Sequence, residues 1–268
     1  MKNWQQILLT LKMARWKAWE GFIDKFPLFS PDKDLSGYKT GHLPIPPASL
    51  RLRVGEASRH IYLITGERVS RRLRNQLKKY LKLEDCQSIL DWGCGCGRLI
   101  RNFPEIAPST RLYGCDIDPD AIKWLKENFP DMSFDKISPY PPTPYTENQF
   151  DLIYGISVFT HLTEQTQFLW LDELKRISKK NGIVAVTVHG ETTTDPSLAN
   201  PLSESGIADR EGDRWMFFKH FLDDGYYRLT KHRKDYVMDK WSAYFEILDF
   251  VDKGIGRQDL VIMRNSLK

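Results

Sequence analysis

The sequence lacks long hydrophobic runs. Its apolar stretches are only a handful of residues long, whereas a helix that spans a bilayer needs roughly 18. The first segment is interrupted by Lys12, Arg15 and Lys17 and contains no small-residue cleavage site, so we expect no signal peptide. Hydrophobic residues make up 41% of the chain and charged residues 28%, which excludes a disordered or collagen-like protein. These features predict a globular protein without stable membrane insertion.

Cysteine is scarce and the charges nearly balance. The four cysteines, Cys86, Cys94, Cys96 and Cys115, include no CxxC pair, which argues against a zinc site or a disulfide framework and favours a reducing, cytoplasmic setting. The net charge of +4 is too small to indicate nucleic-acid binding by itself, and we expect no DNA partner. Acidic residues within 191–241 lack metal-ligand spacing, so no metal is expected.

Composition divides the chain into an N-terminal extension (1–55) and a domain (56–268). Residues 1–26 have the apolar spacing of an amphipathic helix, and the proline-rich residues 27–55 are expected to form a loop. The first helix is basic. Packing on its own domain or on a dimer partner is favoured over a membrane surface, so a homodimer through this helix is a candidate assembly. A second basic helix is predicted over about 70–82.

From residue 87 onward, short apolar runs alternate with helical stretches. Five strands are predicted, at 88–92, 111–117, 132–137, 150–156 and 182–190. The helices between them are predicted at 99–107, 119–129 and 168–178, the last ending at Asn181-Gly182. Two further apolar runs, 244–251 and 259–264, are predicted to form a closing antiparallel hairpin. This order predicts an α/β fold with a mostly parallel, Rossmann-like sheet and an insertion, 191–241, after the fifth strand.

The strongest local motif is the run Asp91-Trp92-Gly93-Cys94-Gly95-Cys96-Gly97-Arg98, which follows a strand. Its glycines allow a sharp turn and a close approach of the backbone to a ligand. A dinucleotide fingerprint would need a third glycine where Arg98 stands, and the Gly-Lys-Ser/Thr of a phosphate loop is absent. The turn therefore predicts a ligand other than a pyrophosphate.

An acidic residue follows the second strand. Asp116 lies 23 residues after Gly93, at the edge where such sheets bind ligands, and can accept hydrogen bonds from both ribose hydroxyls. The alternative is a helix cap, but Asp118 suits that role better because Pro119 follows it.

These motifs resemble motifs I and II of class I S-adenosylmethionine-dependent methyltransferases, through LDWGCGCGR and YGCDIDPDAI. The matching region covers about 87–190, and the closing hairpin agrees with that fold. SVFTHL, TVHG and QDLVIMR are similar to a bacterial branch of methyltransferase-domain proteins whose substrates are mostly unassigned.

The resemblance implies S-adenosylmethionine as cofactor and assigns residues to it. Asp91, Gly93, Cys94, Gly95 and Gly97 would line its methionine portion, Asp116 would bind the ribose, Ile117 would cover the adenine, and Ser157 would also contact the cofactor. Arg51 or Arg53 is a guess for its carboxylate.

The acceptor side rests on histidines and aromatic residues. His161 and His189 each follow a strand, so both are candidate general bases and acceptor-binding residues, with a hydrogen bond to backbone as the structural alternative. His232, among charges, is expected to be solvated. The insertion is predicted to cap the substrate, with Tyr236 and Trp241 as the roof of the pocket.

Together these features predict a methyltransferase that acts on an oxygen or nitrogen of a small-molecule or glycan-like acceptor. The acid/Asn-Pro-Pro-aromatic motif of enzymes that methylate exocyclic base amines is absent after the fourth strand. An RNA or protein methyltransferase is one alternative, and a cofactor-binding module with little catalysis is another.

Overall fold

The computed structural model describes residues 40–56, 58–191, 202, 205–211, 222 and 226–266. The predicted N-terminal helix, and with it the expected dimer contact, lies outside these residues. No helix in the described ranges is long and apolar enough to cross a bilayer.

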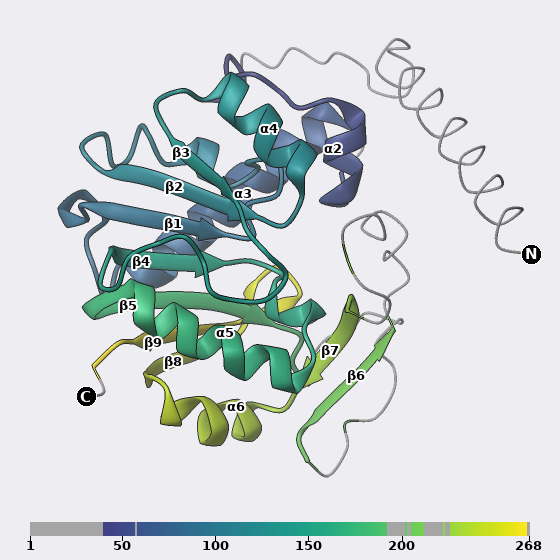
Figure 1. The fold of residues 1–268 in the computed structure, drawn as a ribbon, viewed down its shortest axis with the longest axis vertical. Coiled ribbons are helices and arrows are strands. Elements are labelled where there is room, and N and C mark those ends of the chain that lie inside the picture. Colours follow the sequence, from purple (N-terminus) through teal and green to yellow (C-terminus); the bar gives the residue numbers. More distant parts are fainter. Residues whose placement is uncertain are drawn as a thin grey trace, which may run out of the picture.

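A seven-stranded sheet forms the centre of the molecule (Figure 1). Its strand order is β3 (Ser133–Lys136), β2 (Arg111–Asp116), β1 (Ser88–Trp92), β4 (Phe150–Gly155), β5 (Ser178–Val188), β9 (Gln258–Arg264) and β8 (Glu246–Ile255). Neighbouring strands from β3 to β5 are parallel, whereas β9 is antiparallel to both β5 and β8. The predicted Rossmann-like sheet with an antiparallel closing hairpin is confirmed.

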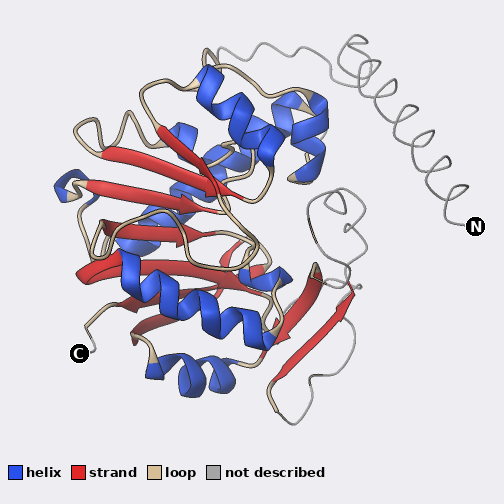
Figure 2. Ribbon diagram, in the orientation of Figure 1, coloured by secondary structure: helices blue, strands red, loops and turns tan. Residues whose placement is uncertain are grey.

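Helices cover both faces of this sheet (Figure 2). Because successive side chains of a strand point to opposite faces, Leu90 and Ile153 pack with α5 (Glu164–Ile177), while Ile89 and Leu152 pack with α3 (Arg59–Leu77). The short helix α4 (Pro119–Asn128) joins the α3 side. All five residues of β1 are buried, as expected for a central strand covered on both faces.

Several helix boundaries differ from the prediction. The expected loop 27–55 contains a short helix, α2 (Ala48–Arg53), directly after Pro47. Helix α3 begins at Arg59, not near residue 70, because the Ser58 side chain caps it by accepting a hydrogen bond from the Ile61 N–H. Only a 3₁₀ turn, Ile100–Asn102, follows the glycines, since Pro104 cannot donate a helical hydrogen bond. Helix α5 ends at Ile177, and Asn181 instead lies in an irregular part of β5 at φ +64°.

The insertion after β5 contributes a second, two-stranded antiparallel sheet, which we call the cap: β6 (Ile207–Glu211) and β7 (Arg228–His232). Figure 1 places the cap beyond the carboxyl ends of the parallel strands. Helix α6 (Lys234–Lys240) then leads back to β8. The His232 N–H donates to the His189 carbonyl at 2.8 Å, so the two ends of this insertion meet at the carboxyl end of β5.

Candidate active site

A cavity of about 500 Å³ lies where the cap faces the carboxyl ends of the parallel strands. Its lining comes from two places. We name one the glycine-loop side (residues 91–96, 98 and 116–118) and the other the cap side (residues 157, 158, 161, 162, 189, 222, 226, 227 and 229). Among the predicted site residues, the lining includes Asp91, Gly93, Cys94, Gly95, Asp116, Ile117, Ser157, His161 and His189. The structure therefore brings together both predicted halves of the site.

The glycine turn is tight at three positions. Gly93, Gly95 and Gly97 have φ values of +76°, +53° and +80°, which side-chain-bearing residues rarely adopt. A Cβ on Gly93 would clash with a methyl carbon of Val158. Gly97 does not line the cavity, contrary to its predicted position beside the methionine portion, because it faces Leu125 of α4 instead.

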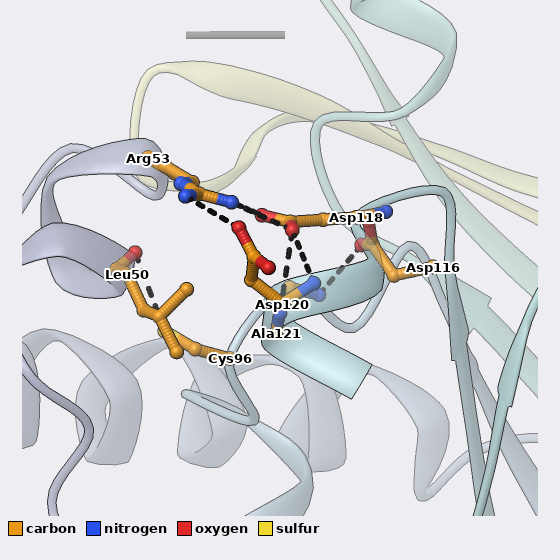
Figure 3. A network of polar contacts seen from close by, with 8 residues as sticks. Leu50, Arg53, Cys96, Asp116, Asp118, Asp120 and Ala121 are labelled. Atoms are coloured by element: carbon orange, nitrogen blue, oxygen red, sulfur yellow. Dashed lines mark hydrogen bonds and ion pairs between the residues drawn. The ribbon is translucent and has the colours of Figure 1, made fainter. Parts of the chain in front are cut away.

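Asp116 and Asp118 have different roles in the site (Figure 3). Asp116 accepts hydrogen bonds from the Gly95 N–H at 2.7 Å and the Asp118 N–H at 2.9 Å, and it faces the cavity. Asp118 caps α4 by accepting from the Asp120 and Ala121 N–H groups, as the sequence predicted. Burial raises the pKa of Asp116 to about 6, although its backbone hydrogen bonds act in the opposite direction.

Asp91 has an oxygen without a hydrogen-bond partner in the described part of the chain. Its Oδ2 is fully buried, and the residue lines the cavity. Burial raises the pKa of this carboxyl group to about 7. A buried carboxylate oxygen that lacks a partner is costly unless a cation or donor completes it. The glycine-loop side thus suits a ligand that carries an ammonium group and vicinal hydroxyls.

The N-terminal extension also reaches this cavity. Leu50, Arg53 and Val54 line it, but the arginines are not arranged as guessed for a ligand carboxylate. The Arg53 guanidinium donates to both carboxylate oxygens of Asp118 at 2.7 Å and to Asp120 at 3.0 Å (Figure 3). Arg51 is buried away from the cavity and donates to the Pro46 carbonyl. Both arginine side chains therefore form hydrogen bonds with other groups of the protein.

His161 lies in the 3₁₀ turn after β4 and forms hydrogen bonds through both ring nitrogens. Its Nδ1 is 2.8 Å from the Arg228 carbonyl oxygen, and its Nε2 is 3.0 Å from the Tyr227 hydroxyl. The two rings stack with centroids 4.2 Å apart. His161 therefore faces the cavity while also holding the backbone of the cap. His189, at the end of β5, reaches the cavity and pairs with Lys231 of β7 through a backbone bridge.

Tyr236 and Trp241 do not form the roof of the cavity, contrary to the prediction. After β7 the chain turns under the cap toward α5, where the Tyr236 hydroxyl donates to Glu164 at 2.6 Å. Trp241 is fully buried against Phe159, with ring centroids 4.7 Å apart. The aromatic cap residues that do line the cavity are Tyr226 and Tyr227.

His232 is buried in the core, contrary to the expectation that it is solvated. Its Nε2 lies 2.9 Å from the Gln167 Oε1, and none of its surface is exposed. Burial lowers its pKa to about 3, so this imidazole is neutral at physiological pH and fastens the base of the cap.

The sequence reading missed Gln258, at the start of β9. This side chain lines the cavity and bonds two strand ends together: its Oε1 accepts from Thr187 at 2.7 Å, and its Nε2 donates to Ser157 at 2.9 Å. Ser157 has a φ of +64°, an unfavourable conformation for a serine, and its N–H donates to Thr187. Gln258 therefore helps to hold a strained residue at the centre of the site.

The sheet order, the glycine turn after β1 and the acid after β2 define the Rossmann-like fold of class I S-adenosylmethionine-dependent methyltransferases. The solved structure of such a methyltransferase from Clostridium acetobutylicum is similar over 76% of this chain and 96% of its own, with a TM-score of 0.54 and 13% identity.

Residues 89–182 match the family model described as a methyltransferase domain. These residues thus carry a methyltransferase domain. An Arabidopsis thaliana tRNA (carboxymethyluridine(34)-5-O)-methyltransferase is 31% identical over 46% of this chain and 30% of its own length. A tRNA N(3)-methylcytidine methyltransferase of Schizosaccharomyces pombe is 23% identical over 49% of this chain and 58% of its own. The chain thus spans less than two thirds of either relative's length.

Proposed function

We propose that this protein transfers the methyl group of S-adenosylmethionine to an oxygen or nitrogen nucleophile that enters from the cap side. The observation that carries the proposal is that the glycine-loop side shares one cavity with His161, His189 and Tyr227. A cavity of about 500 Å³ falls within the range of small-ligand sites.

The cofactor fits the chemistry of the glycine-loop side. Asp91 would bind the ammonium group, which completes its unpaired oxygen, and Asp116 would accept from the ribose hydroxyls. Ile117 would cover the adenine, while Gly93, Cys94 and Gly95 would leave room for the methionine chain, with Ser157 beside it. Bound there, the cofactor supplies a methyl group already activated by its sulfonium.

The protein's own part is then to orient the acceptor, exclude water and receive a proton where the nucleophile carries one. Among the described residues, His161 and His189 are the histidines that line the cavity, which makes them the candidates for proton transfer. Among the described residues, no group of three or more His, Cys, Asp or Glu side chains is arranged to hold a metal ion.

An RNA nucleoside is the acceptor class with the most support. The two curated relatives are named for tRNA, which favours RNA over the small-molecule or glycan-like acceptor suggested by the sequence. Helix α3 and the segment after it also present exposed cations suited to phosphates, namely Arg68, Arg71, Arg72, Lys78 and Lys82.

The test is methyl transfer from isotopically labelled S-adenosylmethionine to bulk tRNA, with nuclease digestion and mass spectrometry of the nucleosides. A parallel reaction uses the RNA-free small-molecule and glycan fraction of a cell extract, and Asp116→Ala is the inactive control. We expect label in a nucleoside. Label only in the RNA-free fraction would return the acceptor to the small-molecule class. No transfer in either reaction, with cofactor binding intact by calorimetry, would identify a binding module.

A further inference from the structure

The positive charge of the chain is concentrated in one segment. Residues 59–82, which form α3 and the turn after it, contain eight arginines and lysines but a single acidic residue, Glu67. The whole chain has a net charge of only +4, so the rest of the molecule is slightly negative. Six of these basic residues are exposed, and we call them the basic stripe: Arg68, Arg71, Arg72, Lys78, Lys79 and Lys82.

The helix arranges these cations along one side. Residues three or four positions apart in a helix lie on the same side, about 5 Å apart along the axis. Arg68 has this spacing to both Arg71 and Arg72 within α3. The opposite side of the helix is apolar and packs on the sheet through Leu73 and Leu77. The basic stripe is therefore carried by a rigid element whose other side is already buried.

Few carboxylates balance the basic stripe. Within the described part of the chain, Lys79 has a long ion pair with Asp249, at 3.9 Å, and the other five residues of the stripe have none. Crowding of like charges affects Arg74 on the same helix. Burial lowers the pKa of its guanidinium, and the positive charge of Arg71 lowers this pKa further. Like charges at this spacing are unfavourable, so a polyanion that neutralises them gains binding energy.

The basic stripe begins beside the cavity. The Tyr62 hydroxyl of α3 donates to the carbonyl of Cys96 in the glycine turn at 2.9 Å. About one turn further along the helix, Gly66 lies against the backbone of Arg98, where a Cβ would clash. Both Cys96 and Arg98 line the cavity. Arg68 is two residues beyond Gly66, a rise of about 3 Å. A ligand bound along the stripe therefore extends from the glycine-loop side of the cavity.

We propose that the basic stripe binds the phosphate backbone of the RNA that carries the acceptor nucleoside. The inference rests on the proposed methyl transfer to RNA and adds a docking surface outside the cavity. An anionic membrane is the weaker match, because a helix that lies on a membrane inserts apolar side chains. In the range 68–82, all of which the structure describes, no large hydrophobic side chain is exposed. Phosphate contacts carry no base information, so the stripe positions the RNA while the cavity selects the nucleoside.

The test measures binding of bulk tRNA to the full chain by filter binding at several salt concentrations, without turnover. The stripe variant combines Arg68→Gln, Arg72→Gln and Lys78→Gln. Each lost phosphate contact should reduce the slope of log K against log salt by about 0.7–0.9, so the slope should fall by about two to three. At about 0.1 M salt the Kd should rise at least about tenfold. The Tm and the affinity for S-adenosylmethionine should remain close to wild type, because the three side chains are exposed.

A matched control removes the same charge elsewhere. Lys123→Gln, Lys126→Gln and Lys136→Gln replace three exposed lysines of α4 and β3, and this variant should bind tRNA like the wild type. Arg68→Lys with Arg72→Lys keeps the charge of the stripe and should bind within about threefold of the wild type, because phosphate attraction depends mainly on charge.

Lysine acetylation of the wild type locates the contact without any substitution. Bound tRNA should slow acetylation of Lys78 and Lys82, measured by mass spectrometry, and leave Lys123 and Lys126 unchanged. Equal protection of both pairs, or protection of the second pair alone, would overturn the proposal.

Other outcomes separate this inference from the proposed function. In the methyl-transfer assay with tRNA, the stripe variant should raise the KM for tRNA about tenfold or more and keep kcat within about twofold of the wild type. A wild type that binds vesicles of phosphatidylcholine and phosphatidylserine but not tRNA would overturn the docking of RNA, and methyl transfer to a small molecule could still stand. Stripe-dependent tRNA binding without transfer to any acceptor would contradict the proposed function and leave the RNA-binding surface standing.

Discussion

On the glycine-loop side of the cavity, the hydrogen bonds of Asp116 link it to backbone groups of its own βαβ unit. Asp116 accepts from the N–H of Gly95, 21 residues before it, and from the N–H of Asp118, two residues after it. On the cap side, the contacts join side chains that are far apart. His161 and Tyr227 are separated by 66 residues, and Ser157 and Gln258 by 101.

This difference has a physical consequence. Contacts within one βαβ unit form wherever that unit forms, so the glycine-loop side depends on a short local motif. The cap side forms only when β7 and β9 have docked on the ends of β4 and β5. We therefore expect substitutions on the glycine-loop side to change cofactor affinity strongly. Substitutions on the cap side, which act on the cofactor indirectly, should change this affinity less.

The largest effect is expected for Asp116→Ala. Loss of two charge-assisted bonds to the ribose, each worth about 1.5–3 kcal/mol, should weaken S-adenosylmethionine binding by about 100-fold or more in calorimetry. Because Asp116 also holds the Gly95 and Asp118 N–H groups, the free energy of unfolding without ligand should fall by about 1–3 kcal/mol. Asp116→Asn, which keeps one acceptor oxygen, should lose less. Unchanged affinity in Asp116→Ala would leave Asp116 with a structural role only.

Cofactor binding should also depend on pH. The pKa of Asp116 is raised to about 6, above its unfolded value, so in the folded protein this carboxyl group takes up a proton as pH falls through 6. A protonated carboxyl cannot accept from both ribose hydroxyls, and affinity should drop about tenfold per pH unit below 6. The same proton stabilises the ligand-free fold at low pH, and that stability is lost as pH rises through 6.

Calorimetry from pH 5 to 7.5 separates the two acidic residues. Asp116→Asn should retain only the part of the pH dependence that comes from Asp91, whose pKa is raised to about 7. A wild-type affinity that stays flat across this range would contradict the proposed roles of both carboxylates.

A smaller effect is expected for Gln258→Ala, which tests whether the two sides communicate. The change removes the bonds that hold Ser157 at φ +64° and should weaken S-adenosylmethionine binding about tenfold, as expected for two neutral hydrogen bonds. Gln149→Ala, in a surface turn, is the control of the same residue type. If affinity is unchanged and only acceptor turnover falls, Ser157 belongs to the acceptor site.

The smallest effect is expected for Arg53→Ala. The ion pair with Asp118 is partly exposed at the arginine, so its loss should cost about 1 kcal/mol or less in urea unfolding. Asp118 continues to cap α4, and cofactor affinity should stay within about fivefold of wild type. A loss of affinity beyond tenfold would show that α2 closes directly on the cofactor.

The sequence predicted the fold and most of the glycine-loop side because those features follow from local patterns. Positive-φ glycines after a buried strand, and an aspartate before Pro119, need no knowledge of distant residues. The predicted position of Gly97 beside the methionine portion was wrong, because the packing of α4 places Leu125 next to Gly97.

The cap side was less predictable for the same physical reason. His161 and His189 were placed at the correct sheet edge by the strands that they follow. The prediction that Tyr236 and Trp241 form the roof of the pocket was wrong, because no local pattern reveals that the chain turns toward α5 after β7. Tyr227 and Gln258 carried no signal of their own, since their partners are 66 and 101 residues away.

The hydrogen bond between His232 and His189 joins the two ends of the inserted segment. A segment whose ends are pinned together is a closed loop, and the entropy of closing a loop grows only with the logarithm of its length. For a closed loop, doubling the length costs only about 0.6 kcal/mol. Evolution can therefore lengthen, shorten or exchange this segment without changing the register of any strand in the seven-stranded sheet.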